Sequence, residues 1–211
     1  MKHIIWKICY ESPPPVIQYC KKCGTRTEYN SSGQFRVNAQ KKHLDVWLIY
    51  KCCHCDTTWN ATIYSRISPQ SICGELLECF HNNDEATAFQ YAMNTELLRR
   101  NGVQVLSPAY SIQGEDVSGQ EAVKIMITSD YYFPIKVSTI VREKAKISQS
   151  ALLKWIESGR IRTPTNQDLR KLKMYQAVTL LFYPTEHCGA GQKESEWSAG
   201  DWCSQSGSAA F

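Results

Sequence analysis

Two cysteine pairs in the first quarter of the chain constrain its fold more than any other feature. Cys20-Lys-Lys-Cys23-Gly24 is followed by Cys52-Cys53-His54-Cys55, with 28 residues between Cys23 and Cys52. A Cys-x-x-Cys pair places two thiolates on one tight turn, and two such turns complete a tetrahedral sulfur site for zinc. A redox dithiol needs only one pair, set between a strand and a helix, whereas both pairs here border strand-like segments. The spacing therefore predicts a zinc ribbon.

Four of these cysteines are the predicted ligands. Only Cys20 with Cys23 and Cys52 with Cys55 share the two-residue gap, although a ligand set that uses Cys53 or His54 stays open. Four thiolates close the coordination sphere, so the expected zinc is structural and offers no position for water or substrate. Gly24 supplies the backbone freedom that a turn after a ligand cysteine often needs. The remaining cysteines lack a matching pair and are interpreted as incidental thiols: Cys9, Cys73, Cys79, Cys188 and Cys203.

Composition narrows the class of protein. The chain has 211 residues, of which 43% are hydrophobic and 21% charged, which is typical of a folded soluble protein. No window approaches 18 uninterrupted apolar residues, and the opening segment contains Lys7, Glu11 and three prolines, so we expect neither a membrane span nor a secretory signal. Ten cysteines without an export signal indicate reduced thiols and a cytoplasmic protein.

The pattern of the chain predicts an α+β fold in four consecutive parts. Residues 1–66 form a zinc-ribbon-like domain with a small antiparallel sheet, because 34–38, 45–51 and 57–64 are rich in β-branched and aromatic residues. Residues 67–133 form a middle segment, helical within 74–100 and extended over 103–106 and 123–128. Asn83 or Asp84 can cap the helical part, and Gly102 is a stop signal. Residues 134–184 form a small α/β module, and the aperiodic segment 185–211 is expected to be a disordered tail.

Charge is unevenly distributed along these parts. Residues 1–66 hold ten lysines and arginines against four acidic residues, and residues 136–173 hold ten against three. Residues 67–135 have the opposite balance, with three lysines and arginines against nine acidic residues. Two basic segments around an acidic middle suit polyanion binding, although a charged run is more often a solvated face.

The second basic segment has a distinctive order of elements. A short helix ending at Ala145 precedes a helix that Ser148 can cap and that Gly159 ends, and Arg160-Ile-Arg162 and a strand over 178–182 follow. This order resembles the small RNA-binding domain of the ribosomal protein S-four type, with Thr163-to-Asp168 in place of the usual Asn-Gly hairpin and 174–176 in place of a Gly-Asp turn. The resemblance implies that Lys154, Arg160 and Arg162 face RNA. A helix-turn-helix, with the Ser148-capped helix in a major groove, and plain packing with exposed charge stay open.

A longer string resembles a family without an assigned activity. The residues are Phe35-Arg-Val-Asn-Ala39, Leu44 to Lys51, Cys52-x-x-Cys55 and Thr58-Trp-Asn60, and they are similar to the bacterial family catalogued as domain of unknown function 1062. The likeness runs from about residue 7 to residue 183. It implies a bacterial cytosolic protein and supplies no reaction.

The leading functional hypothesis is a zinc-ribbon protein that binds structured RNA through its C-terminal module. RNA helices hide base edges in a deep groove, so shape and phosphate contacts suit them. A protein-interaction adaptor, docking through the zinc sheet and the acidic middle, is the second hypothesis. An enzyme is least expected, because the chain has no phosphate-cradling glycine loop or deaminase signature and its five histidines are scattered. The predicted phosphate-binding residues are Lys144, Lys146, Lys154, Arg160, Arg162, Arg170 and Lys171.

Overall fold

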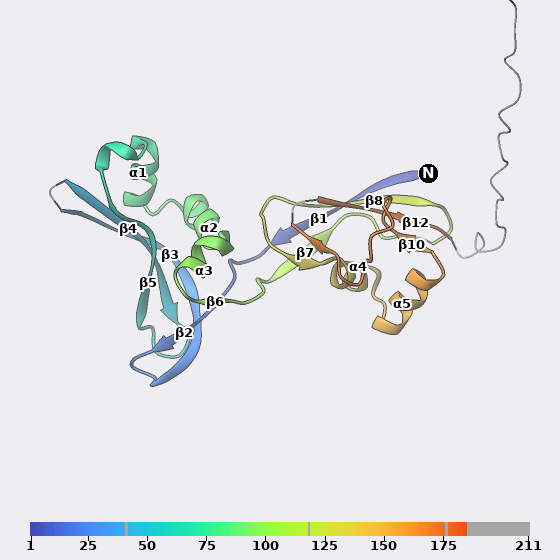
Figure 1. Cartoon of the computed structure of the whole chain (residues 1–211), viewed down its shortest axis with the longest axis horizontal. Helices are drawn as coiled ribbons and strands as arrows, with labels where there is room; N and C mark the ends of the chain where they lie inside the picture. The colour runs from blue at the N-terminus through green and yellow to red at the C-terminus, as the bar shows by residue number, and fades with distance from the viewer. Residues whose placement is uncertain (41, 118, 176, 185–211) are drawn as a thin grey trace, which may run out of the picture.

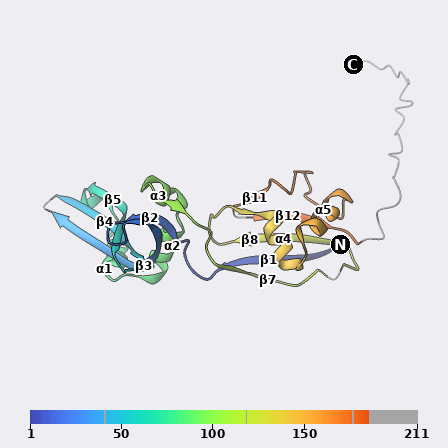
Figure 2. The same ribbon diagram turned by 90° about the horizontal axis from the view of Figure 1, so that it is seen from below.

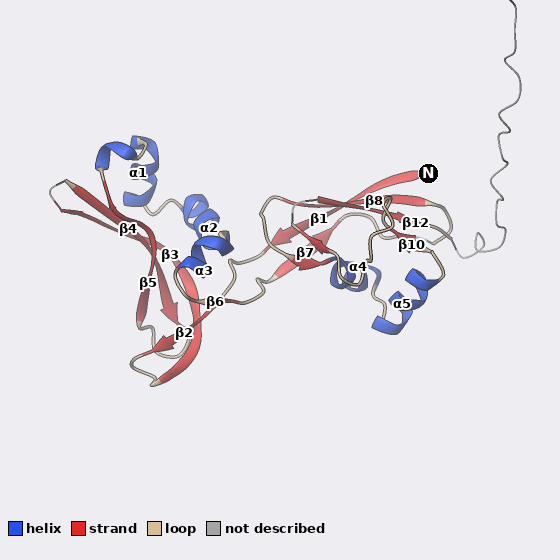
Figure 3. Cartoon of the chain, in the orientation of Figure 1, coloured by secondary structure: helices blue, strands red, loops and turns tan. Residues whose placement is uncertain are grey.

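A computed structural model describes residues 1–40, 42–117, 119–175 and 177–184. Its helices and mostly antiparallel strands confirm the α+β class. The elements form two lobes that lie side by side, each built around one five-stranded sheet (Figures 1 and 3). The predicted tail, 185–211, lies outside the described residues.

The first lobe, called the cysteine lobe, carries both cysteine pairs. Its sheet has the order β5-β4-β3-β2-β6, and three short helices and a 3-10 turn cover it. The strands are β2 (Val16–Cys20), β3 (Thr25–Gln40), β4 (His43–Cys52), β5 (Thr58–Ile67) and β6 (Gln104–Val105), and the helices are η1 (Pro69–Ser71), α1 (Gly74–His81), α2 (Glu85–Met93) and α3 (Thr95–Arg100).

Strand alternation explains the core of this lobe. Val46, Leu48 and Tyr50 on β4 are completely buried, as their period-2 spacing indicates. The three predicted strands are present, and β3 is much longer than expected because it continues through an irregularity between Ser31 and Phe35.

Asparagine and aspartate side chains divide the predicted helical segment into three helices. Asp84 caps α2 by accepting a hydrogen bond from the Thr87 backbone N–H, and Asn94 caps α3 by accepting one from the Leu97 backbone N–H. Asn83, in the left-handed region at φ 52°, accepts a hydrogen bond from the Phe35 backbone at the strand irregularity. Asn101 exchanges two hydrogen bonds with the Thr62 backbone on β5. Helix ends are thereby fastened to the sheet.

The second lobe, called the terminal lobe, combines the first strand of the chain with its C-terminal half. Its main sheet has the order β10-β12-β8-β1-β7, in which β1 and β8 are parallel and the other pairs antiparallel. The elements are β1 (Lys2–Tyr10), β7 (Tyr110–Gln113), β8 (Val123–Ser129), β9 (Ile135–Lys136), α4 (Val137–Ala145), α5 (Gln149–Glu157), β10 (Ile161–Arg162), β11 (Lys173–Met174) and β12 (Ala177–Phe182).

The two sheets do not follow the four consecutive parts expected from the sequence. Residues 2–10 pair with β7 and β8, so the first strand belongs to the terminal lobe, and the cysteine lobe is inserted between β1 and β7. The reason is the alternation of Ile4, Trp6 and Ile8, which buries one side of β1 in the core that β8 and β12 also line. A local sequence pattern can indicate a strand, but it does not predict a partner strand more than 100 residues away.

The predicted elements of the C-terminal module are present. Ser148 caps α5 by accepting a hydrogen bond from the Ala151 backbone, and Lys146 ends α4 in the left-handed conformation. However, β10 and β12 join the sheet of β1 and β8 rather than forming a separate sheet. The likeness to the S-four-type RNA-binding domain therefore stays a prediction.

Two chain connections cross between the lobes. Leu106 donates a backbone hydrogen bond to Pro15 and Glu11 donates one to Ala109, which ties the two connections to each other. The Phe89 ring of α2 lies 5.1 Å from the Tyr131 ring of the terminal lobe. Within the described ranges, every helix is too short or too polar to span a lipid bilayer.

Candidate metal centre

Both cysteine pairs lie at one end of the cysteine-lobe sheet because of its connectivity. Cys20 is the last residue of β2 and Cys52 the last of β4, so each pair forms the turn into the next strand. Successive strands β2 to β5 are antiparallel, and alternate turns of such a meander fall at the same end. Two turns far apart in sequence are thereby brought together.

The two turns have the same backbone geometry. Gly24 donates a hydrogen bond to the carbonyl of Cys20 at 2.9 Å, and Asp56 donates one to the carbonyl of Cys52 at 3.0 Å. Both residues are left-handed, at φ 70° and 57°. Asp56 thus occupies the position that glycine fills in the first turn, a role that the sequence reading assigned only to Gly24. The signal was available, since each residue stands four after the first cysteine of its pair.

The four sulfur atoms meet at one point. All lie within 4.8 Å of one another, with 3.4 Å between the sulfurs of Cys20 and Cys55 and 3.9 Å between those of Cys23 and Cys52. A tetrahedron of zinc–sulfur bonds of 2.3 Å separates its sulfurs by about 3.8 Å. A disulfide would need about 2.05 Å. Spacing and donor chemistry therefore fit a metal ion held by four thiolates.

Polar side chains around the sulfurs favour their charged form. The Tyr29 hydroxyl hydrogen-bonds to the Cys20 sulfur and lowers the pKa of that thiol to about 5. The Thr27 hydroxyl lies 3.2 Å from the Cys52 sulfur and lowers the pKa of Cys52. Hydrogen bonds shared with Cys55 and Cys20 raise the pKa of Cys23 to about 12. The sequence analysis did not identify Thr27 and Tyr29. Their position beside the cysteines depends on the pairing of β3 with β2 and β4, which no local motif predicts.

Cys53 and His54 lie outside this cluster. Both are exposed, and in the described part of the chain the four-sulfur group consists of Cys20, Cys23, Cys52 and Cys55. The Cys53 backbone donates a hydrogen bond to the Glu28 carbonyl on β3, which holds the turn against the sheet.

The predicted phosphate-binding residues have different surroundings. Lys144 is mostly buried, with its side chain 13% exposed, and its Nζ contacts Asp116 at 2.8 Å and the Gly114 carbonyl at 2.7 Å. Arg170 forms an ion pair with Asp168 at 2.9 Å. By contrast, Lys146, Lys154 and Lys171 are exposed and form no ion pair within the residues that the structure describes.

Two arginines of this set lie against aromatic rings. The Arg160 guanidinium carbon lies 4.5 Å from the centre of the Trp155 ring and 4.9 Å from that of Phe182. Arg162 lies 5.4 Å above the Tyr183 ring and donates a hydrogen bond to its hydroxyl. Arg160 is half-buried, whereas Arg162 is exposed.

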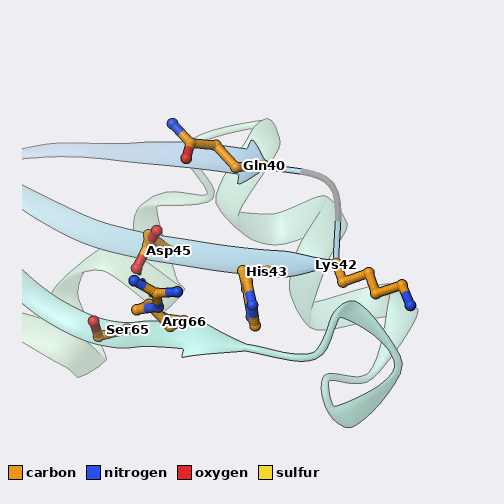
Figure 4. Close-up of a pocket in the computed structure, with 6 residues that line it drawn as sticks. All are labelled: Gln40, Lys42, His43, Asp45, Ser65 and Arg66. Carbon is orange, nitrogen blue, oxygen red and sulfur yellow. Dashed lines mark hydrogen bonds between the residues drawn. The ribbon is translucent and has the colours of Figure 1, made fainter.

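An open hollow of about 780 Å³ lies at the end of the cysteine-lobe sheet opposite the sulfurs. Figure 4 shows its polar lining around the β3–β4 hairpin and β5. Arg66 is left-handed there, and its backbone N–H donates to Asp45 at 2.8 Å. This bond occupies the Asp45 carboxylate, and the described residues that line the hollow include no group of three or more metal-binding side chains.

A family model matches residues 37–167 of the chain, and its description is "Protein of unknown function (DUF1062)". The chain belongs to this family. The matched range includes Cys52 and Cys55, begins after Cys23 and extends through α5 and β10. Searches of curated proteins and of solved structures gave no match.

Proposed function

We propose that this member of the family binds one structural zinc ion and uses its C-terminal segment to bind structured RNA in the bacterial cytosol. The observation that carries the zinc part is the meeting of four thiols on two equivalent turns. Tetrahedral sites made only of thiolates favour zinc or iron. With four protein ligands no coordination position remains for water, so the ion would join the two turns rather than perform chemistry.

Elemental analysis of the purified protein tests the zinc proposal. We expect one zinc ion per chain, and Cys55→Ser should lose most of it because zinc ligation is coupled to folding of the turns. Cys53→Ser is the matched control, two residues away on the same turn, and should keep its zinc. Iron in place of zinc, or loss of metal from the Cys53 variant, would overturn the assignment.

The RNA proposal rests on the basic residues of α5 and β10. Stacking on aromatic rings holds the guanidinium groups of Arg160 and Arg162 in fixed planes, and planar guanidinium forks suit bidentate phosphate contacts. Lys154 on α5 and Lys146 and Lys171 in the flanking turns add exposed positive charge. Lys144 and Arg170 are already paired with carboxylates, so we leave them out of the proposed phosphate contacts.

Anisotropy titrations of a labelled RNA hairpin at several salt concentrations test this proposal. Replacing Lys154, Arg162 and Lys171 together by alanine should flatten the slope of log affinity against log salt by roughly two to three, because fewer counterions are released. Preference for duplex DNA would favour α5 as a recognition helix in a major groove. Absence of nucleic-acid binding at low salt would overturn the proposal and favour the adaptor hypothesis.

A further inference from the structure

One face of the terminal-lobe sheet is not covered by helices. Figures 1 and 2 show α4 and α5 on one side of the sheet and no helix of the described chain on the other. Side-chain burial agrees: Ile4, Trp6 and Ile8 of β1 point into the core, whereas the alternate residues His3, Ile5 and Lys7 are exposed. We call the uncovered side the open face. Its residues are His3, Ile5 and Lys7 of β1, Lys124, Met126 and Thr128 of β8, Thr179 and Leu181 of β12, and Arg162 of β10.

Strand pairing arranges the open face in rows. One row crosses four adjacent strands as His3, Lys124, Leu181 and Arg162, and it spans about 14 Å at the usual strand spacing. The next row crosses three strands as Ile5, Met126 and Thr179. The first row carries two cations, Lys124 and Arg162, and the second is mainly apolar, so the two kinds of side chain lie alongside each other.

The apolar row is unusually exposed for the centre of a sheet. Ile5 is 55% and Met126 41% exposed, and they are direct cross-strand partners on the two central strands. Scattered apolar residues on a surface need no explanation, but adjacent ones on an uncovered sheet face suggest a binding surface.

Charge identifies the kind of partner. Asp130, just beyond β8, pairs with Lys7 at 2.9 Å, and no open-face residue carries a carboxylate. Lys124 and Arg162 form no ion pair within the described part of the chain, so the face is net positive. A second copy of the same face would bring like charges together. An anionic partner with flat apolar groups fits instead, since phosphates can contact Lys124 and Arg162 while bases lie against the aliphatic side chains of Ile5 and Met126.

We propose that the open face binds unpaired nucleotides of RNA, such as those of a hairpin loop. This inference rests on the proposed RNA-binding function and adds the surface on which the bases lie. Arg162 belongs to both surfaces, because it is one of the basic residues of the proposed function and is also the cross-strand partner of Leu181 on the open face. Proteins usually hold single strands by phosphate contacts together with stacking of bases on aromatic rings. On the open face, Ile5 and Met126 would provide the flat apolar contact in place of the rings.

The test compares two labelled RNAs, a single-stranded 12-nucleotide RNA and a hairpin whose loop has the same sequence. Lys124→Glu should weaken binding of both at least tenfold and reduce the salt slope by about one. Met126→Asp should weaken binding at least tenfold because it places a carboxylate where bases would stack. Lys51→Glu, which makes the same charge change on an exposed lysine of the cysteine lobe, should change affinity less than twofold.

Photo-crosslinking with 4-thiouridine RNA gives a readout on the unmodified protein, with crosslinks expected in β1 and β8. If the wild-type protein binds RNA but both open-face variants bind equally well and crosslinks fall elsewhere, this inference fails and the proposed function stands. If the wild-type protein binds no RNA at low salt, both fail. If polyglutamate of equal charge displaces the RNA at equal concentration, the face is a site for acidic peptides and the inference is overturned.

Discussion

At the scale of single residues, the candidate metal centre includes side chains that are not predicted ligands. Tyr29 is buried, and its hydroxyl hydrogen-bonds to the Cys20 sulfur. A hydrogen bond to a thiolate stabilises the charged form that also binds metal. Hydrogen bonds from such partners tune metal sites by orienting and stabilising the ligands.

The Tyr29 hydroxyl should set the pH at which metal is released. Because the pKa of Cys20 is lowered from 9.0 to about 5, its stabilising contribution is complete above pH 9 and is lost progressively as the pH falls to about 5. Tyr29→Phe removes the bond, so protons compete sooner and the midpoint of metal release should rise by about half a pH unit. A chromophoric zinc indicator followed through an acid titration measures this midpoint.

Tyr50→Phe is the control for this experiment. Tyr50 is completely buried in the same sheet, but its hydroxyl has no hydrogen-bond partner in the described structure. Its removal should leave the release midpoint unchanged. Equal shifts in the two variants would show that packing, rather than the thiolate hydrogen bond, sets the midpoint.

At the scale of elements, Asn101 fastens α3 to the sheet. Its side chain accepts a hydrogen bond from the Thr62 N–H at 2.7 Å and donates one to the Thr62 carbonyl at 2.9 Å. Asn101→Ala should lower the free energy of unfolding by about 1–3 kcal/mol, because it leaves backbone groups of β5 without partners. Urea denaturation measures the change. Asn82→Ala, an exposed helix-end asparagine, should change stability by less than about 0.5 kcal/mol, and an equal loss there would contradict the role given to Asn101.

Local elements were predictable where local chemistry determines them. The Ser148 cap, the β4 alternation and the cysteine turns all follow from short-range spacing, and each is present. The helix start at α2 was predicted, because Asn83 or Asp84 could cap it and Asp84 does. The break between α2 and α3 was not predicted, because the helical spacing of Phe89, Met93 and Leu97 continues across it while Asn94 caps a new helix. Short polar side chains that bond to nearby backbone compete with helix continuation.

At the scale of the whole molecule, each lobe has its own core, although Met93 of α2 packs into the core of the terminal lobe. One core is centred on Trp6, Ile125 and Phe182, and the other on Val46, Leu48 and Phe80. The sequence could not show that β1 belongs with the C-terminal half, since its partners lie more than 100 residues away. The open face likewise becomes visible only when β1, β8, β12 and β10 are aligned.

Metal removal should therefore affect one lobe. Chelation at neutral pH should increase amide hydrogen exchange in the two cysteine turns and the adjoining ends of β2 to β5, because metal binding is coupled to their folding. The strands β1, β8 and β12 should keep their protection, since their core contains no metal ligand. Hydrogen exchange followed by mass spectrometry would reveal the pattern, and equal loss of protection in both lobes would contradict the independence of the cores.

Zinc K-edge X-ray absorption of the purified full-length protein tests the central claim most directly. A closed site made of Cys20, Cys23, Cys52 and Cys55 predicts four sulfur neighbours at about 2.3 Å and no nitrogen or oxygen in the first shell. A first shell that contains nitrogen or oxygen, or fewer than four sulfurs, would contradict it, because His54 or water would then complete the coordination.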